Sequence, residues 1–147
     1  MYVMTSVTLH TAEDVREFVE QQRCARLLSR PRLAELAICS RQTIYGLGVG
    51  RNYPRTDTLD QVLHALGVSY QYLPYHHVEP VATSSSELGE RLRSLRHHFG
   101  LTQDDLGQQL GVSHVAVLKH ESLKAWTFGT LYNIASTLGL KSLRVEY

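Results

Sequence analysis

The chain has 147 residues, 43% of them hydrophobic, with 15 lysines and arginines against 14 aspartates and glutamates. The apolar fraction is sufficient for a packed core and excludes wholesale disorder. The near-neutral balance excludes a uniformly basic nucleic-acid binder, so a case for nucleic-acid binding depends on where the charges lie. No long apolar run is present and the first twenty residues are rich in acidic side chains. We therefore expect no transmembrane helix, no signal peptide and a cytoplasmic location.

The first half of the chain predicts a series of short helices. Thr11 begins the first one, with Asp14 three residues later as a variant of the capping box. A second helix has Pro31 in its first turn, where proline is tolerated. A third begins at Ser40 and a fourth at Asp57 or Thr58, each at a residue type that favours a helix start.

Between the third and fourth helices stands a glycine run, Gly46-Leu47-Gly48-Val49-Gly50. A phosphate-binding glycine loop needs a strand before it and a helix after it. Here a predicted helix precedes the run and a loop follows it. We therefore interpret the run as a frayed helix end, because glycine lowers helix stability by roughly 0.5–1 kcal/mol relative to alanine.

The second half predicts four helices in the same order. Ser86 is the expected N-cap of the first, Thr102 that of the second and Ser113 that of the third, with Gly111 ending the second helix. The last helix is expected over about 129–138. The two halves repeat one pattern: Ser40 matches Ser113 at an offset of 73 residues.

These helices divide into a first domain over 1–75, a linker over 76–86 that contains proline and serine, and a second domain over 87–147. The end stretches 2–9 and 143–147 alternate and are candidate short β-strands. An exposed strand at the end of the chain is a candidate for pairing with a second chain, which makes a homodimer a candidate assembly.

The stretch "LTQDDLGQQLGVSHVAVLKHE", residues 101–121, resembles the helix-turn-helix domains of the phage-repressor and Cro type, the xenobiotic-response-element (XRE) family. The resemblance covers about 86–140 and, more weakly, about 11–68. It implies an all-α fold of two tandem lambda-repressor-like helix-turn-helix domains, a built-in pseudo-dimer. The family binds double-stranded operator DNA and usually represses transcription, often as a dimer.

In the first copy, the resemblance carries the base-reading positions to Arg41 and Gln42, with Ser40 and Thr43 beside them. A recognition helix enters the major groove with its N-terminal residues toward the base edges. Arginine can contact guanine with two hydrogen bonds and glutamine can contact adenine in the same way. The residue types therefore suit sequence-specific DNA binding.

The resemblance also implies that Arg30 and Arg55 of the first copy contact phosphates. Phosphate attraction requires clustered positive charge. Such a cluster is present between residues 30 and 55, where Glu35 is the only acidic residue and the arginines are Arg30, Arg32, Arg41, Arg51 and Arg55.

In the second copy, the corresponding positions are Gln103, Ser113, His114, Val115 and Lys119. Val115 is a candidate for contact with a thymine methyl group. Acidic residues outnumber lysines by one between residues 101 and 124. This copy has the clearer family signature but the less favourable chemistry for DNA.

The first copy departs from the family at Ile38, where a turn glycine is usual, and at Gly46 and Gly48 within the recognition helix. Ile38 is strained if the turn keeps a positive φ. These departures support an alternative function: an antitoxin or antiactivator that binds a protein partner, such as a toxin or an activator, and has reduced DNA binding.

No arrangement of residues indicates an enzyme, a cofactor or a metal site. The pairs His76-His77 and His97-His98 are interpreted as linker and helix-surface residues, because adjacent histidines do not easily share one tetrahedral centre. Cys24 and Cys39 are interpreted as reduced core residues. Tyr70, Tyr72 and Tyr75, and also Trp126, are interpreted as core residues, with a surface for a partner as the alternative.

Overall fold

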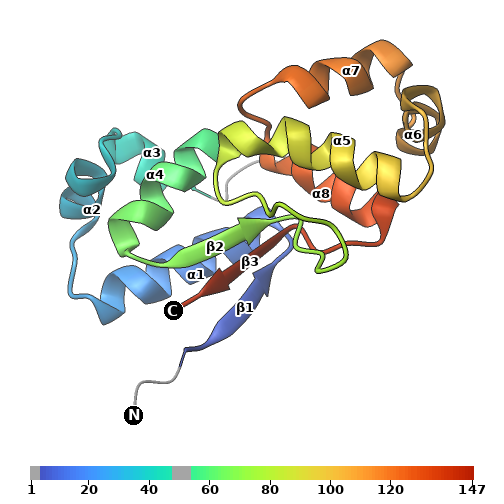
Figure 1. The fold of residues 1–147 in the computed structure, drawn as a ribbon. Coiled ribbons are helices and arrows are strands. Elements are labelled where there is room, and N and C mark those ends of the chain that lie inside the picture. Colours follow the sequence, from blue (N-terminus) through green and yellow to red (C-terminus); the bar gives the residue numbers. More distant parts are fainter. Residues whose placement is uncertain (1–3, 48–53) are drawn as a thin grey trace.

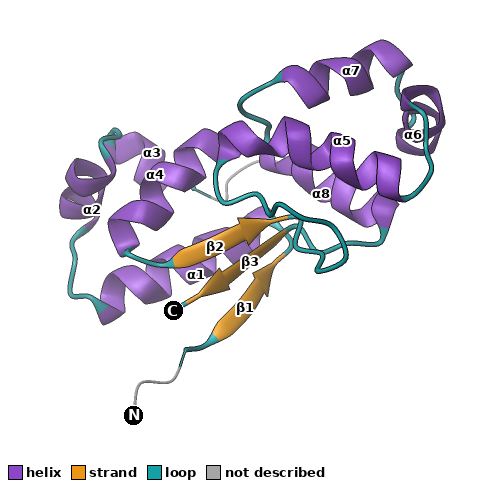
Figure 2. Cartoon of the chain, viewed as in Figure 1, coloured by secondary structure: helices purple, strands orange, loops and turns teal. Residues whose placement is uncertain are grey.

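The computed structural model describes residues 4–47 and 54–147 and is mostly helical, with one small sheet (Figures 1 and 2). In the first half the elements are β1 (Ser6–Leu9), α1 (Ala12–Ala25), α2 (Arg30–Ala37), α3 (Arg41–Tyr45), α4 (Thr56–Leu66) and β2 (Ser69–Tyr72). In the second half they are the short 3₁₀ turn η1 (Ser85–Glu87), α5 (Leu88–His98), α6 (Gln103–Leu110), α7 (His114–Ser122), α8 (Phe128–Leu138) and β3 (Leu143–Glu146). The helical class and the two terminal strands predicted from the sequence are confirmed.

The sheet has the order β1-β3-β2, with β3 antiparallel to both neighbours. Leu143 of β3 pairs with Leu9 of β1 on one side and with Tyr72 of β2 on the other. The suggestion that the C-terminal strand pairs with a second chain is therefore wrong, because both of its hydrogen-bonding edges are already occupied. The strand β2 was not predicted, and it is the element that closes the second edge.

Equivalent points of the two halves contact each other around a local twofold axis. We call residues 6–72 the first unit and residues 85–146 the second unit. Arg55 and Thr127, the residues before α4 and α8, stand 72 positions apart and form an antiparallel bridge. In the β2–β3 ladder, Gln71 pairs with Arg144 and Tyr72 pairs with Leu143. These pairs are 73 and 71 positions apart, one on either side of the offset of 72. Antiparallel pairing of equivalent residues relates two segments by a twofold rotation.

The sheet and the helices α3 and α7 lie on opposite sides of the molecule (Figure 1). Figure 1 shows the sheet below the helices, with α3 at one end of the helical layer and α7 at the other, both on the side away from the sheet. The two short helices that follow the turns therefore lie on one side of the molecule.

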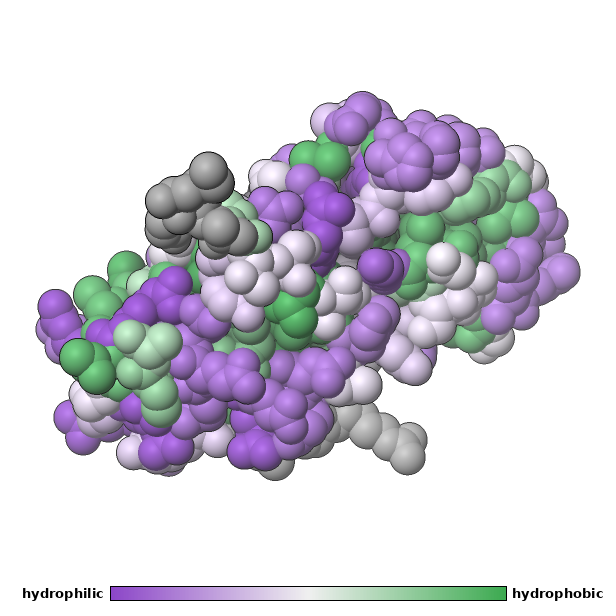
Figure 3. Space-filling model, turned by 90° about the horizontal axis from the view of Figure 1, so that it is seen from below, coloured by the Kyte–Doolittle hydropathy of each residue, from purple (hydrophilic) through white to green (hydrophobic). Residues whose placement is uncertain are grey.

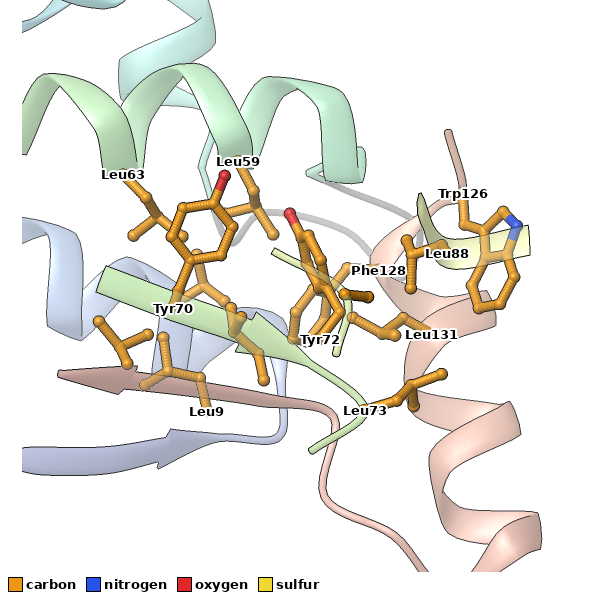
Figure 4. Packing of buried hydrophobic residues seen from close by; sticks show 14 of the residues in the cluster. Leu9, Leu59, Leu63, Tyr70, Tyr72, Leu73, Leu88, Trp126, Phe128 and Leu131 are labelled. Atoms are coloured by element: carbon orange, nitrogen blue, oxygen red, sulfur yellow. The ribbon is translucent and has the colours of Figure 1, made fainter. Parts of the chain in front are cut away.

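One continuous core runs through both units. Figure 4 shows Tyr72 of β2 beside Phe128 and Leu131 of α8. Tyr70, Tyr72 and Trp126 are buried, which confirms their interpretation as core residues. The two cysteines are free, as expected, but the core position predicted for them is wrong for Cys24, which is exposed on α1, while Cys39 is half-buried.

The helix caps agree with the sequence at most positions. The capping boxes at Thr11 and Thr102 are both complete, and Ser113 caps α7. Ser86 does not cap α5, because η1 leads directly into that helix and the cap position carries no side-chain hydrogen bond. The helix α8 begins at Phe128, one residue before the predicted start, because Thr127 provides its cap.

Candidate nucleic-acid interface

The turns before α3 and α7 have the same backbone conformation. Ile38 ends α2 with φ 55° and ψ 48°, and Gly111 ends α6 with φ 74° and ψ 29°. Two residues later, Ser40 and Ser113 cap the next helices. The left-handed geometry anticipated at Ile38 is therefore present, and in a non-glycine residue it costs roughly 1–2 kcal/mol.

Arg41 and Gln42 lie exposed in the first turn of α3, directly after the cap. No side-chain hydrogen bond or ion pair engages either residue within the described part of the chain. Thr43 is half-buried and its hydroxyl lies 2.8 Å from that of Ser40. Of these predicted base-reading residues, Arg41 and Gln42 have the freedom to contact another molecule.

The helix α3 is much shorter than α7. It spans Arg41–Tyr45 and ends just before Gly46, whereas α7 spans His114–Ser122. The helix end thus falls where the sequence places the first glycine of the run. The glycines at 48 and 50, together with Arg51 of the predicted DNA-binding arginine cluster, lie outside the described residues.

The two other predicted phosphate contacts of the first unit already have carboxylate partners. The Arg30 guanidinium lies 2.9 Å from Glu20 and 5.3 Å from the ring centre of Tyr45. The Arg55 guanidinium lies 3.3 Å from Asp57. Since both arginine side chains are about half exposed, a phosphate group can reach them but has to compete with these carboxylates.

In the second unit a buried carboxylate joins three helices. Glu121 of α7 accepts hydrogen bonds from Arg96 of α5 at 3.0 Å and from the Gln103 amide of α6 at 3.3 Å. Its side chain has no exposed surface. Gln103, predicted to face phosphate, is half-buried, and this interaction engages its side-chain amide within the protein. In the sequence, Glu121 stood out only as one of the acidic residues between 101 and 124.

The first unit contains a similar network in which the carboxylate comes from a different helix. Arg23, the equivalent of Arg96, donates to the Leu28 carbonyl as Arg96 does to that of Leu101, 73 residues later. Its carboxylate partner is Glu20 of α1, at 2.8 Å, and Arg30 donates to the same carboxylate. Hydrogen bonding from Arg23, and to a lesser degree from Arg30, lowers the pKa of Glu20. The carboxylate that α7 supplies in the second unit is thus supplied by α1 in the first.

The outer face of α7 is partly apolar. His114, Val115 and Lys119, three predicted contact residues, are exposed. Val115 and Leu118 of α7 and Val112 of the turn before it follow each other at three-residue spacing and are 59%, 46% and 41% exposed, respectively. Three-residue spacing places side chains on one face of a helix. The second unit therefore presents hydrophobic and basic side chains together.

The described residues contain no group of three or more histidine, cysteine or acidic side chains able to hold a metal ion. The rings of His77 and His98 instead lie 5.1 and 5.5 Å from that of Tyr75, where they form an aromatic cluster. None of the helices within residues 4–47 and 54–147 has the length and apolar character needed to cross a membrane.

Comparisons with protein-family models, curated proteins and solved structures returned no match for this chain. The functional assignment therefore depends on the residues and geometry described above.

Proposed function

We propose that this chain is a sequence-specific DNA-binding transcriptional regulator with two helix-turn-helix units, and that it acts as a repressor. The observation that carries the proposal is the local twofold axis between the units, with α3 and α7 on the side away from the sheet. Dimeric helix-turn-helix proteins bind two half-sites that mirror their own twofold symmetry. Here one chain supplies both halves.

The two units differ in what they offer to the DNA. Arg41 and Gln42 are exposed donors and acceptors that suit base edges, whereas His114 and Val115 offer an imidazole and an apolar contact. The expected site is therefore bipartite and asymmetric. The half-site of the first unit supplies most of the sequence preference.

The test begins with selection of binding sequences from random duplex DNA, followed by fluorescence anisotropy on the selected site over a salt series. Phosphate contacts make the logarithm of the affinity fall linearly with the logarithm of salt concentration. Arg41→Ala should relax sequence preference by about 1–3 kcal/mol, while Arg55→Ala should weaken all sequences alike. Arg16→Ala, which removes the same charge from the exposed face of α1, is the control and should leave binding nearly unchanged.

One observation favours a second function, that of an antitoxin or antiactivator holding a protein partner. It is the exposed apolar stripe formed by Val115 and Leu118 on α7 and by Val112 in the turn before it. DNA binding that is absent or insensitive to salt, together with a stable protein complex that Leu118→Asp abolishes, would favour this function and contradict the first. Steep salt dependence with Leu118→Asp binding DNA normally would contradict the second.

A further inference from the structure

A cavity of about 310 Å³ lies at the sheet end of the molecule, where the two units meet. Gln71 of β2 lines it from the first unit, Lys141 and Arg144 line it from the second, and Tyr75 and His76 of the connecting loop complete the wall. Its volume is at the lower end of the range for small-molecule sites. Figure 3, which views the molecule from below, shows a mostly hydrophilic surface with separate apolar patches.

The loop that forms one wall is held in place by a buried cation. Arg91 of α5 is 2% exposed and donates hydrogen bonds to the carbonyls of Leu73, Tyr75 and Pro80 at 3.0 to 3.1 Å, and also to that of Val78. No described carboxylate forms an ion pair with Arg91. The loop is thus wrapped around a positive charge that carbonyl groups contact directly and that the carboxylate of Glu79 stabilises from a greater distance.

This wrapping directs other backbone groups outward. In a trans peptide the N–H points opposite to the preceding carbonyl. The carbonyls of Tyr75, Val78 and Pro80 point to Arg91, so the N–H groups of His76, Glu79 and Val81 point away from it. None of these three has a hydrogen-bond acceptor among the described residues, and all three residues line the cavity. Backbone N–H groups that face one concave surface are a recurrent means of binding anions, and here they come from three separated positions of one loop.

The charged side chains that line the cavity are also positive on balance. Lys141 is exposed and has no carboxylate partner among the described residues. Arg144 donates to the Gln71 amide at 2.9 Å and lies 3.9 Å from Glu146. Glu79 is the only carboxylate in the lining. Two cations, one carboxylate and three N–H groups therefore surround a space that Tyr75 bounds with an aromatic ring, and the lining carries a net positive charge.

We propose that this cavity binds a small anionic molecule, with its phosphate or carboxylate group on Lys141, Arg144 and the loop N–H groups and its apolar part against Tyr75. The ligand touches both units beside their local twofold axis. It therefore stiffens the junction that sets α3 relative to α7, and ligand binding raises DNA affinity. This second consequence depends on the proposed DNA-binding function, whereas the binding site does not.

The test is titration of ¹⁵N-labelled protein, followed by NMR, with three probes: inorganic phosphate, adenosine monophosphate and benzoate. At least one probe should shift the amide signals of His76, Glu79 and Val81, and comparison of the three identifies the preferred head group. Lys141→Gln should weaken that probe about tenfold, the loss expected for one charge-assisted hydrogen bond. Lys124→Gln, an exposed lysine outside the cavity, should leave binding unchanged.

Shifts confined to other regions, no response to any probe, or equal effects of the two lysine variants would overturn the binding site. A probe that binds without changing the affinity for a selected DNA site would overturn only the regulatory consequence. Absence of DNA binding with normal probe binding would contradict the proposed function and leave the anion site standing.

Discussion

Thr56 and Trp126 exchange hydrogen bonds across the junction of the two units. The Thr56 N–H donates to the Trp126 carbonyl, and the Trp126 N–H donates to the Thr56 hydroxyl oxygen, both at 2.9 Å. The same hydroxyl lies 2.6 Å from that of Ser85, and all three residues are buried. A single threonine therefore connects the start of α4 with the segments before α5 and α8.

The first prediction concerns this threonine. Thr56→Val keeps the shape of the side chain but leaves the Trp126 backbone N–H without its acceptor, while the Ser85 hydroxyl loses Thr56 and keeps its hydrogen bond to the Lys124 carbonyl. We expect a loss of about 1–3 kcal/mol in the free energy of unfolding, the usual cost of an unsatisfied buried polar group. Urea denaturation measures it. The control is Thr58→Val, two residues further along α4, which should change the free energy of unfolding by less than about 0.5 kcal/mol. Equal losses in both variants would contradict the role assigned to Thr56.

The second prediction compares the two turns. Ile38→Gly should stabilise the protein by about 1 kcal/mol, because it relieves a left-handed backbone strain at a side chain that is 84% exposed. Gly111→Ala should destabilise it by a similar amount. A Cβ atom there meets nothing within 4 Å, so the cost arises in the backbone alone. Thermal melts of both variants test this, and a destabilising Ile38→Gly change would mean that the Ile38 side chain has an unidentified contact.

The third prediction compares the two carboxylate networks. Glu121→Ala leaves Arg96 buried without its partner and should cost about 3–5 kcal/mol. Glu20→Ala should cost at most about 1 kcal/mol, because its side chain is 28% exposed and water can solvate Arg23 and Arg30. Denaturant unfolding measures both values. Equal losses in the two variants would contradict this prediction, because they would mean that water reaches the Glu20 network no better than the Glu121 network.

The fourth prediction concerns pH. Burial, and secondarily the charge of Lys119, lowers the pKa of His120 below its usual 6.5, and its Nδ1 atom is buried without a partner among the described residues. Below about pH 6.5 the unfolded chain takes up a proton that the folded protein resists, so the free energy of unfolding falls as the pH drops. His120→Gln should flatten stability between about pH 6.5 and 5.

The carboxyl group of Glu20 does not contribute to this pH dependence. The pKa of Glu20 is lowered from 4.5, so its stabilising contribution is present above that value and is lost only at lower pH. Denaturation of wild type and His120→Gln at several pH values separates the two effects. Parallel pH profiles for the two proteins would show that His120 is not the titrating group.

Local signals in the sequence were sufficient for most helix starts and ends. The capping boxes at Thr11 and Thr102 and the cap at Ser113 depend on residues three positions apart, which a sequence displays directly. The repeat was visible because equivalent positions keep small, apolar or capping residues. The exposed positions of Arg41 and Gln42 followed from the same register.

What the sequence did not indicate depends on distant contacts. The strand β2 contains two tyrosines next to a proline-containing loop, and it becomes a strand because β3 offers a free edge. That the carboxylate comes from α7 (Glu121) in one unit and from α1 (Glu20) in the other cannot be predicted from the sequence. It depends on α1 lying against the start of α2 in the folded chain. The anchoring of the connecting loop by Arg91 likewise joins residues up to 18 positions apart through carbonyl groups that no side-chain pattern reveals.

The most direct test of the central claim, that one chain carries two DNA-binding units around a local twofold axis, is hydroxyl-radical footprinting on a selected site with the stoichiometry measured alongside. One chain should protect two regions about one helical turn, roughly 34 Å, apart on the same face of the duplex. Arg41→Ala should weaken protection of only one of them. A single protected region, a requirement for two chains, or no protection at all would contradict the claim.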